Sequence, residues 1–78
     1  MRLLAFARAR DVFGFSEQEV TPRSGETPAA LLDRLFPAKR DALPKSTRPA
    51  VDAEYVGWDV PIPEGAKELA ILPPVSGG

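Results

Sequence analysis

The sequence contains no cysteine and no histidine, and these two absences exclude several kinds of chemistry. Without them the chain can form no disulfide, no thiolate nucleophile and no imidazole base. Ser16, Ser24, Ser46 and Ser76 therefore have no histidine to accept a proton, which excludes a Ser–His nucleophile. The usual nitrogen and sulfur ligands of zinc are missing, and the carboxylates are dispersed. We expect no metal site and no cofactor bound by the chain itself.

Long apolar runs and blocks of like charge are also missing. The longest nearly uninterrupted apolar stretch, Leu3 to Ala7, is far shorter than the roughly 20 residues of a membrane span, and no cleavable signal pattern precedes it. Ten basic and eleven acidic residues give a net charge of −1 without a basic run, which argues against a nucleic-acid partner. We expect a soluble cytoplasmic protein that binds neither nucleic acid nor membrane.

The patterns along the 78 residues predict one small domain of strands and a single helix. Thr27 and Pro28 predict the start of that helix, because a hydroxyl cap precedes a proline at the first helical position, and Pro37 ends it. The connection 37–49 is predicted to be mobile or to hold a short helical turn at 39–43. The predicted strands are 2–8, 16–21, 49–56 and 67–72, with a turn at 10–14 and a short strand or turn at 57–60.

This order of elements indicates an α+β fold with one helix packed across a mixed sheet, because the strands flank a single helix instead of alternating with several. The residues predicted to form the core are Phe6, Leu31, Leu35, Val51, Leu69 and Ile71.

The last six residues form the most informative segment. Pro73 and Pro74 cannot continue a helix or donate to a sheet ladder, which predicts that the chain leaves the domain (1–72) as an extended arm (73–78). Val75 and Ser76 follow, and Gly77 and Gly78 present only backbone, so a carboxylate at Gly78 could enter a slot too narrow for a Cβ atom. Terminal glycines can also be incidental, but here the arm directly follows the predicted strand 67–72.

Several segments together resemble the small, sulfur-carrying subunits of molybdopterin synthase. They are Leu4–Asp11, Thr27–Leu31, Ala50–Asp52 and, most specifically, the ending Leu72–Gly78. The resemblance implies a β-grasp, ubiquitin-like fold. It also implies that an enzyme related to ubiquitin activators uses ATP to adenylate the carboxylate of Gly78, and that sulfur from a donor protein then replaces AMP to give a thiocarboxylate.

In such a cycle the arm, Pro73 to Gly78, inserts into the large subunit, where sulfur passes to a pyranopterin precursor. The family resemblance further implies a complex of two small and two large chains, with no catalysis by the small chain alone. It places Phe6, Arg10, Tyr55 and Leu72 against the large subunit. Phe6 and Leu72 could instead belong to the core, and Arg10 could be a solvated turn residue.

The chain departs from the family pattern at two places. Asp52 stands where an asparagine usually follows the valine, so the donor capacity of an amide is lost there. The turn before the last predicted strand, within 64–69, is about one residue longer than usual.

Three other functions remain open from the sequence. The chain could carry sulfur for another pathway such as thiamine synthesis, it could be a protein modifier joined to lysines through Gly78, or it could be a binding module with an incidental tail. The Pro-Pro-Val-Ser segment before the glycines favours the molybdopterin branch.

Overall fold

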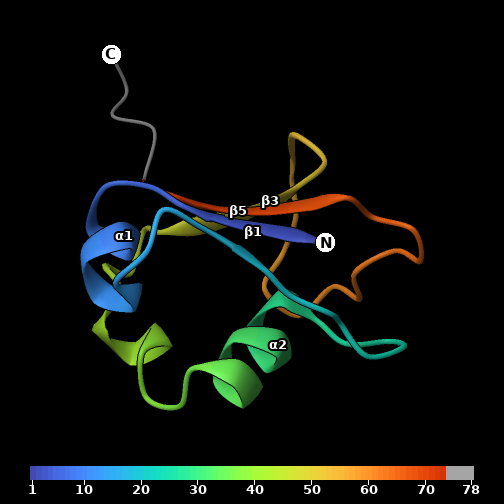
Figure 1. The fold of residues 1–78 in the computed structure, drawn as a ribbon, viewed down its shortest axis with the longest axis horizontal. Coiled ribbons are helices and arrows are strands. Elements are labelled where there is room, and N and C mark those ends of the chain that lie inside the picture. Colours follow the sequence, from blue (N-terminus) through green and yellow to red (C-terminus); the bar gives the residue numbers. More distant parts are fainter. Residues whose placement is uncertain (74–78) are drawn as a thin grey trace.

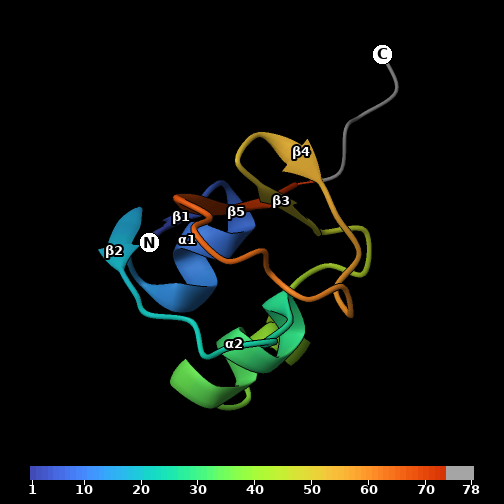
Figure 2. The same ribbon diagram turned by 90° about the vertical axis from the view of Figure 1, so that its right-hand side faces the viewer.

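The computed structural model describes residues 1–73, and within this range the backbone forms a five-stranded mixed sheet with its helices on one side (Figure 1). The strands are β1 (Arg2–Ala5), β2 (Glu17–Glu19), β3 (Arg48–Val51), β4 (Glu54–Tyr55) and β5 (Glu68–Leu72). Their order is β2-β1-β5-β3-β4, with β1 and β5 parallel and the other neighbours antiparallel. Figure 2 shows β2 and β4 at opposite edges. The predictions made for residues 74–78 lie outside the described residues.

The core lies between the sheet and the main helix, α2 (Pro28–Leu35). Apolar side chains from both layers meet there: Leu3, Ala5, Val51, Leu69 and Ile71 from the sheet, and Leu31 and Leu32 from α2. Burial is confirmed for four of the predicted core residues, Leu31, Val51, Leu69 and Ile71, and Leu35 is partly buried against them. The prediction for Phe6 as a core residue is wrong, because its side chain is 44% exposed.

Helix α2 begins and ends where the sequence predicts. Thr27 is the N-cap, and its Oγ1 accepts a hydrogen bond of 3.1 Å from the backbone N–H of Ala30. Pro28 occupies the first turn, where a missing N–H costs nothing. Phe36 closes the helix one residue before Pro37. The short helical turn expected in the following connection is present as η1 (Arg40–Ala42).

The segment after β1 differs from the prediction. The first strand ends at Ala5 instead of Arg8, and the residues expected to form a turn fold as the short helix α1 (Arg8–Phe13). Ala7 reverses the chain at φ 51°, and Gly14 ends α1 in the left-handed conformation at φ 87°. The helix is held by tertiary packing: the ring of Phe13 lies 5.9 Å from Phe15 and 5.3 Å from Phe36 between centroids.

The predicted strand 49–56 is two strands. β3 ends at Val51, and Asp52 and Ala53 form a tight turn with φ values of 48° and 71° before β4 begins at Glu54. Two-residue hairpin turns with positive φ usually contain glycine, which is absent here. The apolar and polar alternation continues across the turn, which explains the error. Trp58 and Asp59 lie in a turn and not in a strand.

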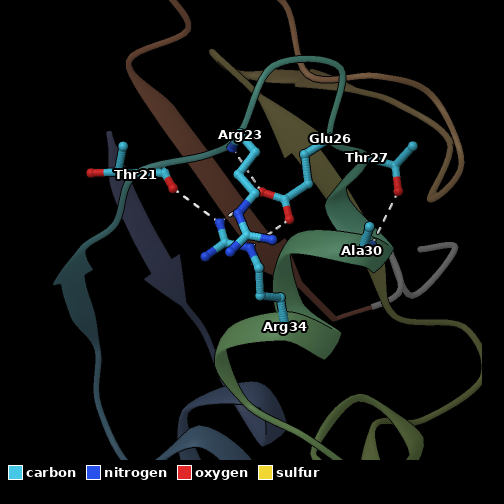
Figure 3. A network of polar contacts seen from close by, with 6 residues as sticks. All are labelled: Thr21, Arg23, Glu26, Thr27, Ala30 and Arg34. Carbon is cyan, nitrogen blue, oxygen red and sulfur yellow. Dashed lines mark hydrogen bonds and ion pairs between the residues drawn. The ribbon is translucent and has the colours of Figure 1, made fainter.

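A polar network joins the segment before α2 to the helix itself (Figure 3). Glu26 accepts hydrogen bonds from Nε and Nη2 of Arg34 at 2.7 and 2.8 Å, and from the backbone N–H of Arg23 at 2.9 Å. Arg34 also donates to the carbonyl of Thr21. The hydrogen bonds from Arg34 are the main cause that lowers the pKa of Glu26 below its ordinary value. Glu26 is thereby kept ionised, and its hydrogen bonds fasten the loop between β2 and α2 to Arg34 of the helix.

Within residues 1–73, no helix has the length and apolar character that a membrane span requires.

Candidate functional site

The arm begins at the middle of the sheet. Strand β5 lies between β1 and β3, and its last residue, Leu72, is in register with Arg48 of β3. On the other flank, the backbone N–H of Phe6 donates to the carbonyl of Ile71 at 3.2 Å. Pro73 follows Leu72 and is exposed. Hydrogen-bonded neighbours therefore hold the base of the arm on both sides. We call this part of the sheet, formed by Phe6, Arg48, Tyr55, Leu72 and Pro73, the open end.

The face of the sheet that turns away from the helices presents an apolar strip. Because side chains alternate along a strand and Leu69 and Ile71 enter the core, Ala70 and Leu72 face outward. Strand pairing places Leu4, Ala70, Ala50 and Tyr55 in one row across β1, β5, β3 and β4. We call this row, with Leu72, the outer face; Tyr55 is exposed and Leu4 and Leu72 are partly exposed, whereas Ala50 and Ala70 are buried. It lies directly beside the start of the arm.

The structure brings together three of the four residues predicted to contact a partner. Phe6, which follows β1, and Tyr55 on β4 are 44% and 45% exposed, and Leu72 on β5, which lies between β1 and β4 in the sheet, is half-buried. Arg10 lies apart from them on α1, a helix on the other side of the sheet (Figure 1), and is also exposed. The predicted arm residues from Pro74 to Gly78 lie outside the described part of the chain.

Sequence reasoning missed the contribution of Arg48 to this site. Its guanidinium carbon lies 4.5 Å from the centroid of the Tyr55 ring, which is cation–π geometry. Arg48 appears in the sequence as one charge in a basic connection, and its position opposite Leu72 follows only from the register of β3 and β5. Leu4 was missed for the same reason.

The opposite end of the sheet, where β5 begins, has its polar groups joined in pairs. Arg2 Nη2 donates to Glu68 Oε2 at 2.7 Å across the parallel strands. Oδ1 of Asp52 accepts hydrogen bonds from the backbone N–H groups of Lys67 and Glu68 at 3.0 and 3.1 Å. We call this part, formed by Arg2, Asp52, Lys67 and Glu68, the paired end. The carboxylate of Asp52 serves as an acceptor there, so the loss of an amide donor leaves these hydrogen bonds intact.

Among residues 1–73, no group of three or more acidic side chains is arranged to hold a metal ion. The features that the described structure gathers at the open end are apolar and aromatic side chains, one stacked guanidinium and an exposed chain leaving the sheet. Such an arrangement suits contact with another macromolecule.

Comparison with known proteins agrees with this geometry. The profile of the ThiS family matches residues 3–78. The molybdopterin synthase sulfur carrier subunit of Arabidopsis thaliana is 36% identical over 81 residues, an alignment that covers all of this chain and 82% of the relative.

Two solved structures share the fold. A putative molybdopterin converting factor, subunit 1, from Pyrococcus furiosus has a TM-score of 0.72 at 23% identity, and small archaeal modifier protein 1 of Haloferax volcanii has a TM-score of 0.72 at 21% identity. Each comparison covers 95% of both chains. The mixed sheet with α2 across it is therefore the ubiquitin-like β-grasp fold that the sequence predicted.

Proposed function

Because the chain belongs to the ThiS family, we propose that it is a sulfur carrier of molybdenum cofactor biosynthesis that acts as the small subunit of molybdopterin synthase. The observation that supports this most is the similarity to the Arabidopsis carrier subunit, which extends over the whole chain. The ending from Leu72 to Gly78 adds the chemical argument, because a terminal glycine offers a carboxylate without a side chain.

The proposed reactive group is the carboxylate of Gly78. A carboxylate is a poor acyl donor until one of its oxygens becomes a good leaving group. An adenylyltransferase related to ubiquitin activators supplies that group by joining AMP from ATP to Gly78 and releasing pyrophosphate. Sulfur from a donor protein then replaces AMP, which leaves Gly78 as a thiocarboxylate.

The arm then delivers the sulfur inside the large subunit, where it passes to the pyranopterin precursor. Gly77 and Gly78 would fit a narrow passage, and Pro73 and Pro74 restrict φ before binding, which reduces the conformational entropy lost when the arm is ordered. The chain supplies no histidine or cysteine to these steps, so we propose that catalysis belongs to its partners.

The β-grasp body would dock through the outer face and the open end. Phe6, Tyr55 and Leu72 lie beside the start of the arm, so a partner that covers them is correctly placed to receive the residues beyond Pro73. Arg10 would contact the partner only if the interface continues around the end of β1 to α1. We propose an assembly of two small and two large chains.

Intact-mass measurement of the protein purified from its own cells tests the proposal. We expect a fraction of the chains to show the mass gain of one oxygen replaced by sulfur at Gly78, and a variant without Gly77 and Gly78 to lack it. Purified carrier with this modification should convert precursor to molybdopterin when the large subunit is added. Masses that correspond to an isopeptide with another protein would instead identify a modifier, and activity only in a thiamine pathway would identify the other sulfur carrier.

A further inference from the structure

The carrier cycle assigns no role to the stacking of Arg48 on Tyr55 at the open end. Arg48 begins β3 directly opposite Leu72, and Tyr55 lies on β4 opposite Ala50. The guanidinium stacks over the ring at 4.5 Å. The aromatic ring thus supports one face of a cation that borders the apolar row.

Arg48 differs from three other arginines of the chain. Arg2, Arg34 and Arg40 are paired with Glu68, Glu26 and Asp33 at 2.7 to 2.9 Å. Among residues 1–73, no carboxylate lies within ion-pair distance of Arg48. The ring of Tyr55 thus covers one face of its guanidinium, while the N–H groups at the edge keep their capacity to donate.

Docking on the outer face changes the surroundings of this cation. A partner that covers Tyr55 and Leu72 also removes water from Arg48, because Arg48 is stacked on the one and directly paired with the other. A guanidinium that loses water without gaining an acceptor is strongly destabilising, whereas a carboxylate can accept two parallel hydrogen bonds from it. A carboxylate on the partner surface would meet this requirement.

We propose that Arg48, stacked on Tyr55, is a specificity-determining residue that receives an aspartate or glutamate side chain of the molybdopterin synthase large subunit beside the base of the arm. This inference rests on the proposed function. A planar guanidinium can stack on an aromatic ring and donate two parallel hydrogen bonds at once, a combination that the ammonium of lysine lacks, so the contact favours arginine.

The test is titration calorimetry of the full-length chain with the large subunit from the same organism. We expect Arg48→Glu to weaken binding by about 100-fold or more, because two carboxylates then face each other, and Arg48→Lys to weaken it by about 10-fold. Arg48→Gln should make the affinity less sensitive to salt than that of the wild type. Lys39→Glu is the matched control: it makes the same change of charge at an exposed residue beside η1, and should bind as the wild type does.

A charge-exchange experiment identifies the acidic residue of the large subunit that pairs with Arg48. Acidic residues of the large subunit are changed to arginine one at a time, and one such change should restore binding of the Arg48→Glu variant while weakening that of the wild type. Circular dichroism and thermal unfolding confirm that each variant is folded, as expected for an exposed position.

The possible failures are distinguishable. If the wild type binds the large subunit but Arg48→Glu binds equally well, the inference is wrong and the proposed function stands. If Arg48 variants lose adenylation alone and keep their affinity for the large subunit, the assignment to that subunit is also overturned. A wild type that neither binds the large subunit nor delivers sulfur would overturn both proposals.

Discussion

The two ends of strand β5 differ in how many of their polar groups are paired and in how much of their apolar surface is buried. At the paired end, Arg2 is bonded to Glu68, and Asp52 accepts hydrogen bonds from the backbone of Lys67 and Glu68. At the open end, Phe6 and Tyr55 are exposed, and Arg48 contacts an aromatic ring in place of a carboxylate. The polar groups of one end are used within the fold, whereas the other end, where the arm begins, leaves aromatic side chains exposed.

The largest effect is expected beyond the open end. Gly78→Val should lower sulfur transfer by about 100-fold or more, because a side chain at the reacting terminus displaces the acyl carbon in a narrow passage. Its midpoint of thermal unfolding should equal that of the wild type. Mass spectrometry of the terminus and molybdopterin formation provide the measurements. Ala42→Val, which adds bulk at an exposed residue of η1, is the control and should transfer sulfur normally.

Normal sulfur loading and delivery by the Gly78→Val variant would contradict the assignment of the reactive group to the end of the arm. It would show that the reactive group is elsewhere in the chain.

Substitution of two leucines of β5 should distinguish an effect on stability from an effect on partner binding. Leu69 is fully buried, so Leu69→Ala should lower the free energy of unfolding by about 3 kcal/mol. Leu72 is half-buried on the outer face, so Leu72→Ala should lower it by less than about 1 kcal/mol and weaken binding of the large subunit instead. Urea unfolding and calorimetry measure the two effects. An equal loss of stability in both variants would remove the distinction between the two faces.

A single substitution at Asp52 tests the hydrogen bonds of the paired end. Asp52→Ala removes the acceptor for two backbone N–H groups and should lower the free energy of unfolding by about 1 kcal/mol. Asp52→Asn keeps an acceptor oxygen and should cost less. Hydrogen exchange at Lys67 and Glu68 should become faster in the alanine variant. Unchanged exchange there would show that the hydrogen bonds of Asp52 do not hold the start of β5.

The smallest effect concerns the paired charges of Figure 3 and depends on pH. The bonds from Arg34 hold the pKa of Glu26 below its ordinary value of 4.5, so ionised Glu26 stabilises the fold above that pH. This stabilisation is lost as the pH falls through the lowered pKa of the folded state. Compared with Glu26→Gln, the wild type should be more stable by about 1 kcal/mol at pH 7, and the difference should shrink toward pH 3. A difference that does not change with pH would contradict this assignment.

The sequence predicted those parts of the fold that depend on local rules. The cap at Thr27, the proline after it and the apolar run 67–72 led to α2 and β5 because each signal lies within a few residues. Helix α1 was missed because six residues are too few for a helical period, and its stability comes from the contact of Phe13 with Phe36. The turn at Asp52 and Ala53 was missed because it has no glycine.

The candidate site was predictable in its chemistry but not in its geometry. Phe6, Tyr55 and Leu72 were named through the family resemblance, whereas Arg48 and Leu4 were not. Their place depends on strand register, which joins residues more than 20 positions apart and has no local signal. The same limit explains why Phe6 was assigned to the core. The apolar stretch of the sequence continues from β1 through Phe6, but the strand ends at Ala5.

The central position of β5 also has a mechanical consequence. Tension applied along the arm would act parallel to the strand, so the hydrogen bonds to β1 on one flank and to β3 on the other would resist it together instead of breaking one after another. A strand at the edge of the sheet would have only one such neighbour. In the proposed cycle, the body would therefore keep its fold when the arm is withdrawn from the large subunit.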